Sequence, residues 1–267
     1  MRGRESCVTD MEREGEIKAR ESKRVFCLAF AEVQAGVSGI RPLFWVEAVY
    51  GGTNARVWSL EPGDQGDNPS FVFLNFSGMT DLFRKNVSEQ IALLQVLHTL
   101  ADEVNQAGRL AAQTLQAGGK ILFCGNGGSA ADSQHLAAEL TGRFIKDRRP
   151  LAAMALSTDS SALTCIGNDY AFDEVFARQV QGLARAGDLL IGISTSGNSR
   201  NVIRAVEEAK AAGARVVGFL GRDGGALRAM CDVAIVVPSQ VTARIQESHI
   251  LIGHTLCGLI EEHMGLA

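Results

Sequence analysis

The chain has 267 residues, 46% of them apolar, and a formal net charge of −4 at pH 7. The apolar content suffices for a substantial core, and the acidic balance argues against nucleic-acid or anionic-membrane surfaces, which need clustered Lys and Arg. No apolar run approaches the roughly 20 residues of a membrane-spanning helix. The six cysteines are scattered without a C-x-x-C pair, which is typical of reduced thiols. We therefore expect a cytoplasmic protein with no nucleic-acid or membrane partner.

Residues 1–78 differ in composition from the rest of the chain. They contain both tryptophans and three of the five prolines. One apolar piece, KRVFCLAFA (residues 23–31), has some features of a signal peptide. That run is short and acidic residues precede it, so we expect no leader. The segment predicts no particular fold, and it is either a small accessory domain or a poorly ordered, non-native extension.

From residue 79 the pattern is regular and predicts one α/β domain over residues 79–267. A long amphipathic helix over residues 81–116 comes first and ends at the glycines of AGG (residues 117–119). Five short apolar runs then alternate with helical patterns: KILFCG (120–125), LAAMALS (151–157), DLLIGIS (188–194), RVVGFLG (215–221) and VAIVVPS (233–239). Such runs suit a parallel sheet that is buried on both faces. We predict a doubly wound five-stranded parallel sheet with the flavodoxin-like order 2-1-3-4-5.

Two loops of this predicted sheet are suited to a phosphate group. GNGGS (residues 125–129) follows the first strand and STSGNS (residues 194–199) follows the third, and both lead into helices. In the order 2-1-3-4-5 these strands flank the point where ligands gather. Glycines let backbone N–H groups approach an anion, and the hydroxyls of Ser194, Thr195, Ser196 and Ser199 can donate to phosphate oxygens. The alternative is that the loops are ordinary turns and helix caps.

Four separated stretches carry the motifs of one family: CGNGGSAADSQHLAAELTGRF, IGNDYAFDEVFARQV, GDLLIGISTSGNSRNVIRAVEEAKAAG and TARIQESHILIGHTLCGLIEE. They closely resemble the phosphoheptose isomerases of the sugar isomerase (SIS) fold. The resemblance implies conversion of sedoheptulose 7-phosphate to D-glycero-D-manno-heptose 7-phosphate through an enediolate, the first step of ADP-heptose synthesis for the lipopolysaccharide core. It begins at about Met79 and leaves residues 1–78 uncovered, so we expect the native chain to start there.

The resemblance also implies a set of site residues. The catalytic pair is Glu139 and His254, and one Zn²⁺ per site is held by His135, Glu139, Gln246 and His254. The phosphosugar substrate is contacted by Asn126, Gly127, Gly128, Ser129, Glu139, Asn168, Asp169, Ser194, Thr195, Ser196, Ser199 and Gln246. Some family members have Asp immediately before the Arg of RIQE, whereas this chain has Ala243, so any role of that acid is absent or supplied elsewhere.

The residue chemistry agrees with isomerisation, although a simpler explanation exists. Proton transfer between C1 and C2 of a sugar needs a base beside the carbon, for which Glu139 is suited, and an acid or metal beside the oxygens, for which His254 and Zn²⁺ are suited. His135 and Glu139 are four residues apart on a predicted helix. They could therefore be an ordinary surface pair.

Two other functions share this fold. A non-catalytic SIS protein that regulates by binding a replication-initiator partner would lack the residues that match Glu139 and His254, and would carry STRGNS instead of STSGNS. A sugar-phosphate-sensing transcription regulator would need DNA-binding helices upstream, and residues 1–78 show no such pattern.

The spacing of two predicted ligands bears on assembly. Gln246 and His254 are eight residues apart in a helical pattern, which separates their backbones by about 12 Å along a straight helix. Two chains sharing one site would remove the strain of bringing both to a common ion. The alternative is a bent helix or convergent side chains within one chain. We predict a homo-oligomer, a tetramer by resemblance, with its sites at subunit interfaces.

Overall fold

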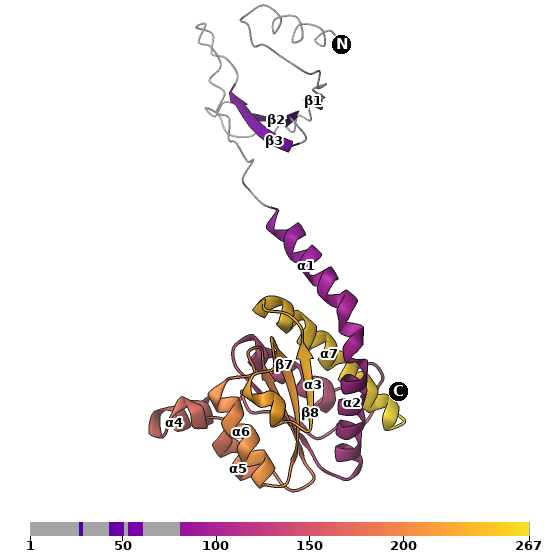
Figure 1. The fold of residues 1–267 in the computed structure, drawn as a ribbon, viewed down its shortest axis with the longest axis vertical. Coiled ribbons are helices and arrows are strands. Elements are labelled where there is room, and N and C mark those ends of the chain that lie inside the picture. Colours follow the sequence, from indigo (N-terminus) through magenta and orange to yellow (C-terminus); the bar gives the residue numbers. More distant parts are fainter. Residues whose placement is uncertain (1–26, 29–42, 51–52, 61–80, 267) are drawn as a thin grey trace, which may run out of the picture. The chain divides into compact units, whose positions relative to one another are not determined.

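The computed structural model describes residues 27–28, 43–50, 53–60 and 81–266, which belong to two compact units, Met1–Leu82 and Phe83–Ala267 (Figure 1). In the first unit, strands β1 (Cys27–Leu28), β2 (Leu43–Tyr50) and β3 (Thr53–Leu60) form an antiparallel sheet in that order. Our sequence reading assigned no fold here, although both longer strands contain the aromatic and β-branched residues that favour strands. The rest of residues 1–78 lies outside the described residues.

The predicted long helix is present but interrupted. Helix α1 (Leu82–Leu97) passes into a short 3₁₀ helix, η2 (His98–Leu100), and then into α2 (Ala101–Gln116). At the interruption the hydroxyl of Thr99 donates to the carbonyl of Val96 at 2.7 Å, in competition with the helical backbone pattern. Helix α2 ends at the predicted glycines, since Gly118 has a φ of +82°, a conformation that favours glycine.

The sheet of the second unit confirms the predicted topology. Its five parallel strands lie in the order β5-β4-β6-β7-β8, which is 2-1-3-4-5 in chain order. The strands are β4 (Ile121–Gly125), β5 (Ala153–Ala155), β6 (Leu189–Ser194), β7 (Arg215–Gly221) and β8 (Val233–Val237). Residues of β4 and β6 are buried throughout because helices cover both faces.

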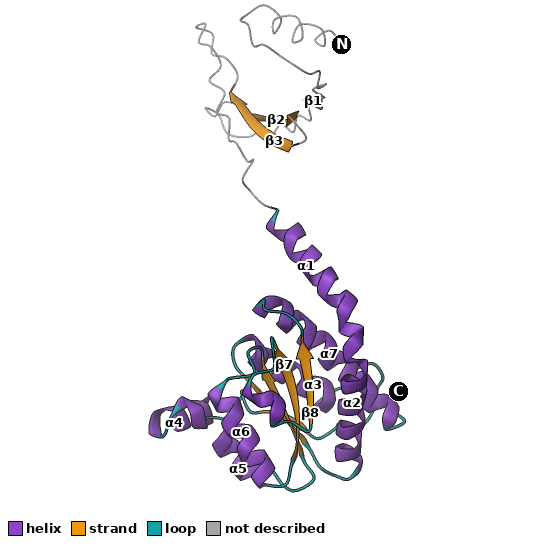
Figure 2. Cartoon of the chain, in the orientation of Figure 1, coloured by secondary structure: helices purple, strands orange, loops and turns teal. Residues whose placement is uncertain are grey.

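Helices form a layer on each face of this sheet (Figure 2). Phe123 points into one hydrophobic core and its neighbour Leu122 into the other, as alternation along a strand requires. The first core is covered by α2, α3 (Gly128–Thr141) and α7 (Thr242–His263), and the second by α4 (Ser160–Asp169), α5 (Ala177–Leu183) and α6 (Arg200–Ala211). Two further 3₁₀ helices are η3 (Phe172–Glu174) and η4 (Ala226–Ala229). None of the helices among the described residues combines the length and apolarity needed to cross a bilayer.

Candidate active site

The turn after β4 and the loop after β6 are joined by their side chains. Asn126 and Asn201 exchange two amide hydrogen bonds, of 2.9 and 2.8 Å, and Asn201 is only 2% exposed. The hydroxyls of Ser194 and Ser199 lie 2.9 Å apart within the second loop. The strand order therefore brings the two loops together as predicted. Asn201, an unpredicted residue of the first turn of α6, takes part in the contact.

The conformation of both loops depends on glycine. Gly127, just before α3, has a φ of +56°, and Gly197 of the STSGNS loop has a φ of +67°. A Cβ atom on Gly197 would lie 1.9 Å from the carbonyl oxygen of Gly224. The N-termini of α3 and α6 begin directly after these loops, so their dipoles favour an anion there. Thr195 and Ser196 are half-buried in the second loop, whereas Ser129 is buried at 3% exposure inside the first turn of α3.

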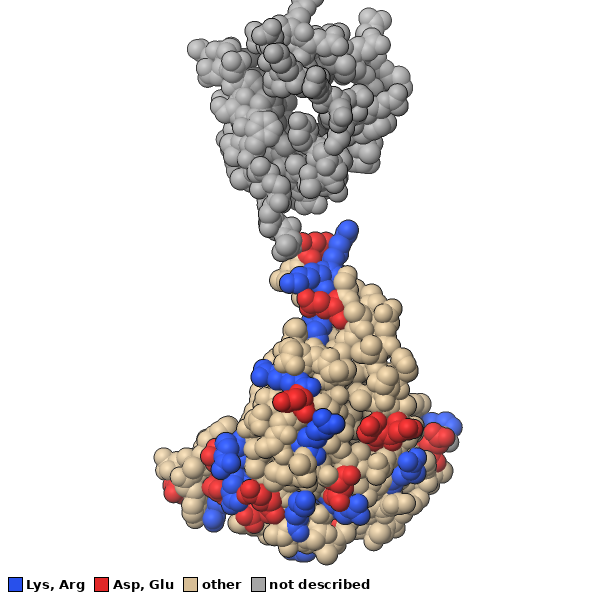
Figure 3. Space-filling model, in the orientation of Figure 1, with Lys and Arg blue, Asp and Glu red and all other residues tan. Residues whose placement is uncertain are grey.

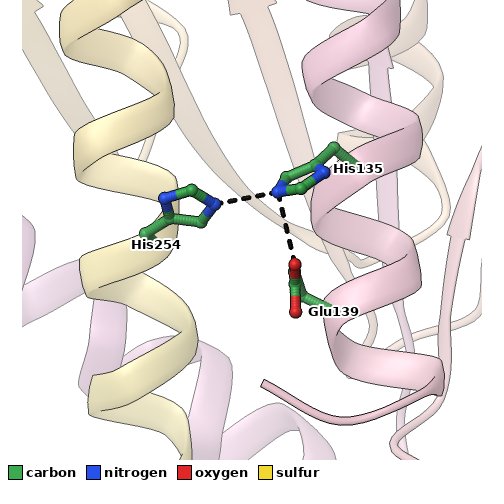
Figure 4. A group of neighbouring side chains, drawn as sticks. All are labelled: His135, Glu139 and His254. Carbon is green, nitrogen blue, oxygen red and sulfur yellow. Dashed lines mark hydrogen bonds and ion pairs between the residues drawn. The ribbon is translucent and has the colours of Figure 1, made fainter. Parts of the chain in front are cut away.

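Three predicted ligands converge beside this region from two helices (Figure 4). His135 and Glu139 lie on α3, and the imidazole Nε2 of His135 is 3.3 Å from Oε1 of Glu139. His254 comes from α7, 119 residues further along the chain, and its Nε2 is 2.8 Å from that of His135. One nitrogen of each imidazole and one oxygen of the carboxylate all lie within 4.8 Å of one another. The surface-pair explanation of His135 and Glu139 does not account for the third partner, His254.

This cluster fits a divalent metal such as zinc. Two imidazoles and one carboxylate are a ligand set of catalytic zinc sites. The fourth predicted ligand, Gln246, packs over the first turn of α3, where a Cβ on Gly128 would be 2.6 Å from the amide Nε2 of Gln246. His254 therefore joins His135 and Glu139 within one chain, while the shared use of Gln246 and His254 by two chains stays a prediction.

An unpredicted acid faces the same cluster. Burial raises the pKa of the Asp132 carboxyl, although the nearby imidazoles of His135 and His254 oppose that shift. Its Oδ2 atom is buried without a hydrogen-bond partner among the described residues. The available signal in the sequence was its position one helical turn before His135. Asp132 thus places a second carboxyl near the candidate metal cluster of His135, Glu139 and His254.

The close packing of α3 and α7 sets the geometry of the cluster. A Cβ on Gly253 would lie 2.6 Å from Leu136, so a larger residue at position 253 would push the helices apart. Phe144, just after α3, stacks on the His254 ring with centroids 5.7 Å apart and an interplanar angle of 26°. Burial raises the pKa of the Cys257 thiol to about 12, with a further contribution from the carboxylate of Glu139, so this neighbour remains a protonated thiol.

Asn168 and Asp169 lie elsewhere on the domain. They end α4, are exposed, and bond to each other through Nδ2 of Asn168 and Oδ1 of Asp169 at 2.8 Å. The hydrogen bond from Asn168, followed by that from Cys165, lowers the pKa of the Asp169 carboxyl. Helix α4 packs against the core on one face of the sheet, whereas α3 and α7 pack against the core on the other face. Among the described residues, no hydrogen bond or ion pair joins Asn168 or Asp169 to His135, Glu139 or His254.

Comparison with known proteins agrees with the geometry. The family model for the SIS domain matches residues 84–221. The phosphoheptose isomerase of Nitratiruptor sp. is 68% identical over 143 residues, which are 54% of this chain and 76% of that protein. That of Aliarcobacter butzleri is 52% identical over 183 residues, 68% of this chain and 97% of that protein. The solved phosphoheptose isomerase of Neisseria gonorrhoeae matches with 52% identity and a TM-score of 0.64, covering 67% of this chain and 97% of that one. This chain belongs to the phosphoheptose isomerase family of SIS-domain proteins.

Proposed function

We propose that this protein converts sedoheptulose 7-phosphate to D-glycero-D-manno-heptose 7-phosphate, and that the product enters ADP-heptose synthesis for lipopolysaccharide in the cytoplasm. The observation that carries the proposal is the convergence of His135, Glu139 and His254 on one point. The relatives named phosphoheptose isomerase, which are up to 68% identical, support the same substrate. A regulatory SIS protein would not need these three groups together.

The proposed reaction moves a proton between two carbons of the open-chain sugar. Glu139 takes the proton from the carbon beside the carbonyl and returns it to the neighbouring carbon, and His254 donates to and accepts from the oxygens of the enediolate. The cluster position suits these roles, since the side chain of Glu139 is 23% exposed and therefore reachable from solvent. A zinc ion held by His135, Glu139, Gln246 and His254 would supply Lewis-acid polarisation of the carbonyl.

The phosphate end of the substrate is assigned to the two joined loops. Ser194, Thr195, Ser196 and Ser199 offer hydroxyl donors, and the N-terminus of α6 adds its dipole. The mutual bonds of Asn126 and Asn201 hold these loops at a fixed separation. This arrangement orients the sugar so that its reacting carbons extend toward α3.

The proposal has a direct test. Purified protein is incubated with sedoheptulose 7-phosphate, with and without a chelator, and the aldose phosphate is resolved by chromatography as a product of unchanged mass. We expect turnover that the chelator abolishes and added Zn²⁺ restores. A zinc-loaded, folded protein that yields no aldose phosphate would refute the proposal and favour the regulatory alternative. Comparing the turnover of a six-carbon ketose phosphate with that of sedoheptulose 7-phosphate measures how strongly the enzyme selects for the length of the sugar chain.

We further propose that the active protein is a homotetramer with sites at its subunit interfaces. Within the unit that begins at Phe83, helix α1 leaves five large apolar side chains exposed: Phe83, Val87, Ile91, Leu94 and Val96. A groove of about 410 Å³ runs between α1 and the loop before α7, lined in part by Leu93, Pro238 and Val241. A second copy of α1 would bury such surface. Asn168 and Asp169 end α4 on the other face of the sheet from α3 and α7, which supports sharing, because they can then serve a neighbouring chain's cluster.

Residues 79–267 are proposed to be sufficient for the activity. The relatives match over a region of this size, since 183 residues of this chain cover 97% of the Aliarcobacter butzleri protein. A chain of residues 79–267 should match the turnover of the full chain, and a large loss would show that residues 1–78 take part.

Charged groups of both signs are interspersed on the described surface that Figure 3 shows, which supports a small-molecule substrate over nucleic acid.

A further inference from the structure

A buried ion pair links α7 to the segment that follows α3, beyond the cluster of His135, Glu139 and His254. Nε of Arg148 donates to Oε1 of Glu261 at 2.8 Å, and the two side chains are only 2% and 1% exposed. Glu261 lies on α7, further along the helix than His254, and Arg148 lies in the segment that follows α3. The second oxygen of Glu261 has no hydrogen-bond partner among the described residues. Burial removes the hydration of both charges, and this cost can exceed the free energy of their attraction. The pair therefore calls for a role other than added stability.

Arg148 also closes the C-terminal end of α3. Its guanidinium donates to the backbone carbonyls of Glu139 at 2.8 Å, Leu140 at 2.9 Å and Gly142 at 3.0 Å. Carbonyls in the last turn of a helix lack intrahelical partners, and the cation also offsets the negative end of the helix dipole. A planar guanidinium can satisfy several carbonyls and a carboxylate together, whereas an ammonium acts as a single point charge. One of these carbonyls belongs to Glu139, a member of the active cluster.

The segment between α3 and Arg148 also contacts His254 on α7. Phe144 lies between the end of α3 and Arg148 in the chain, and its ring stacks on that of His254. Arg148 therefore fixes Glu139 through its backbone and α7 through Glu261. Its segment adds a packing contact to His254.

We propose that Arg148 and Glu261 are positioning residues that set the separation between the Glu139 face of α3 and the His254 face of α7. Neither residue touches substrate or ion in this assignment, and both act through the helices they join. The inference rests on the proposed isomerase function and adds to it. We expect this buried pair to affect the affinity for a divalent metal and the turnover number, and to have little effect on substrate binding.

The decisive variant removes both charges together, so that neither is left buried alone: Arg148→Met with Glu261→Leu. The matched control is Lys120→Met with Asp188→Leu. Lys120 and Asp188 also form an ion pair, 2.5 Å long with Asp188 3% exposed, but it lies where β4 and β6 begin, away from the cluster. Zn²⁺ affinity is measured by competition with a chromogenic chelator, alongside thermal unfolding, kcat and KM.

We expect the Arg148→Met, Glu261→Leu protein to lose Zn²⁺ affinity and kcat by about tenfold to 100-fold, the range typical of residues that orient metal ligands. Its KM should change by less than about threefold. The control protein should keep wild-type Zn²⁺ affinity and kcat even where its unfolding temperature falls. Arg148→Lys retains the charge but loses most hydrogen bonds to the backbone carbonyls. Its Zn²⁺ affinity and kcat should lie between those of wild type and the double variant.

Wild-type Zn²⁺ affinity in the folded double variant would overturn the inference, as would an equal loss of affinity in the control. If the double variant does not fold, Arg148→Lys decides, and undiminished affinity in that protein would overturn the inference. Zinc binding is read without substrate. A wild-type protein that binds zinc but does not isomerise would therefore refute the proposed function while the affinity comparison still tests the positioning role.

Discussion

The amide groups of Asn126 and Asn201 bond to each other in both directions, which locks the turn after β4 to the first turn of α6. Each amide uses one donor and one acceptor on the other, so the geometry has no free rotation about either side chain. This contact is mostly buried and bridges residues 75 apart in the sequence. It holds the GNGGS turn and the start of α6, the proposed phosphate site, at a fixed spacing before any substrate arrives.

Replacing Asn201 with Ala should raise KM for sedoheptulose 7-phosphate by about tenfold with a smaller effect on kcat, since it loosens binding of the remote phosphate. Steady-state kinetics on the purified variant measures both constants. Gln134→Ala is the control, because Gln134 is an exposed residue of α3 whose contacts to Ser157 are both 3.4 Å long. An unchanged KM in the Asn201 variant would show that the amide pair does not support the loops.

Glu139→Gln should lower kcat by about 100-fold to 10,000-fold while leaving the circular dichroism spectrum unchanged, because the amide keeps the shape but cannot accept the carbon-bound proton. His254→Ala should reduce turnover similarly and also weaken zinc retention, since it removes one of the three converging groups. Glu262→Gln, at an exposed position near the end of α7, is the control. Near wild-type turnover in the Glu139 variant would remove it from the role of base.

Mixed oligomers can locate the boundaries of each site. Glu139 and His254 belong to one cluster in one chain, so refolding Glu139→Gln chains with His254→Ala chains should restore no activity. Asp169 ends α4, which packs on the other face of the sheet from α3 and α7, so Glu139→Gln chains refolded with Asp169→Ala chains should recover part of the activity if neighbours contribute Asp169. Each variant refolded alone provides the baseline. Recovery in the first mixture and none in the second would reverse the assignment.

Two glycines of positive φ should differ sharply in their tolerance of alanine. Gly187, with a φ of +89°, has no atoms within 4 Å of an added Cβ, so Gly187→Ala should cost only backbone strain of about 1–2 kcal/mol. In Gly197→Ala the same strain is joined by a clash with the carbonyl of Gly224, for a total of about 2–5 kcal/mol. Urea unfolding of the two variants measures the difference. Equal losses would mean that the STSGNS loop relaxes freely.

The buried His249 should make the fold sensitive to mild acid. Burial lowers the pKa of its imidazole from 6.5 to about 4, although the hydrogen bond to the carbonyl of Leu220 opposes this shift. The unfolded chain therefore binds a proton that the folded chain does not, and stability falls as pH drops from about 6.5 toward 4. The free energy of unfolding should decrease by about 2 kcal/mol between pH 7 and pH 4.5 from this residue.

His249→Gln serves as the comparison, since it removes the titrating group while keeping a side chain that can donate. Its free energy of unfolding should be lower than that of wild type at pH 7 but should vary less between pH 7 and 4.5. Urea titrations at the two pH values supply the four free energies. Parallel losses in both proteins would mean that other groups account for the acid sensitivity.

The sheet was predictable because its five strands are continuous apolar runs, and such runs are a local property of the sequence. The interruption at Thr99 was not, because its hydroxyl bond to Val96 competes with a helix that the periodicity alone would continue. The meeting of the two loops followed from strand order. The position of His254 did not, because it depends on how closely α7 packs on α3 around Gly253.

Other parts of the site came only from three-dimensional contacts. Asn201 and Asp132 are ordinary helix residues in the sequence. Asn201 is distinguished only by its burial and its bonds to Asn126, and Asp132 only by its buried, unpartnered Oδ2 atom. Arg148 lies in a basic, polar stretch that favours solvent exposure, yet its side chain is buried and paired with Glu261 of the last helix. Such long-range pairs leave no periodic signal, so a single sequence cannot reveal them.

The split of the active cluster between α3 and α7 has a consequence during protein synthesis. His135 leaves the ribosome 119 residues before His254, which at about 5–20 residues per second is a delay of roughly 6–24 seconds. During that interval the nascent chain holds only two of the three converging groups, the imidazole of His135 and the carboxylate of Glu139. The three groups come together only when the final helix has docked, so a growing or prematurely terminated chain lacks the complete candidate metal cluster.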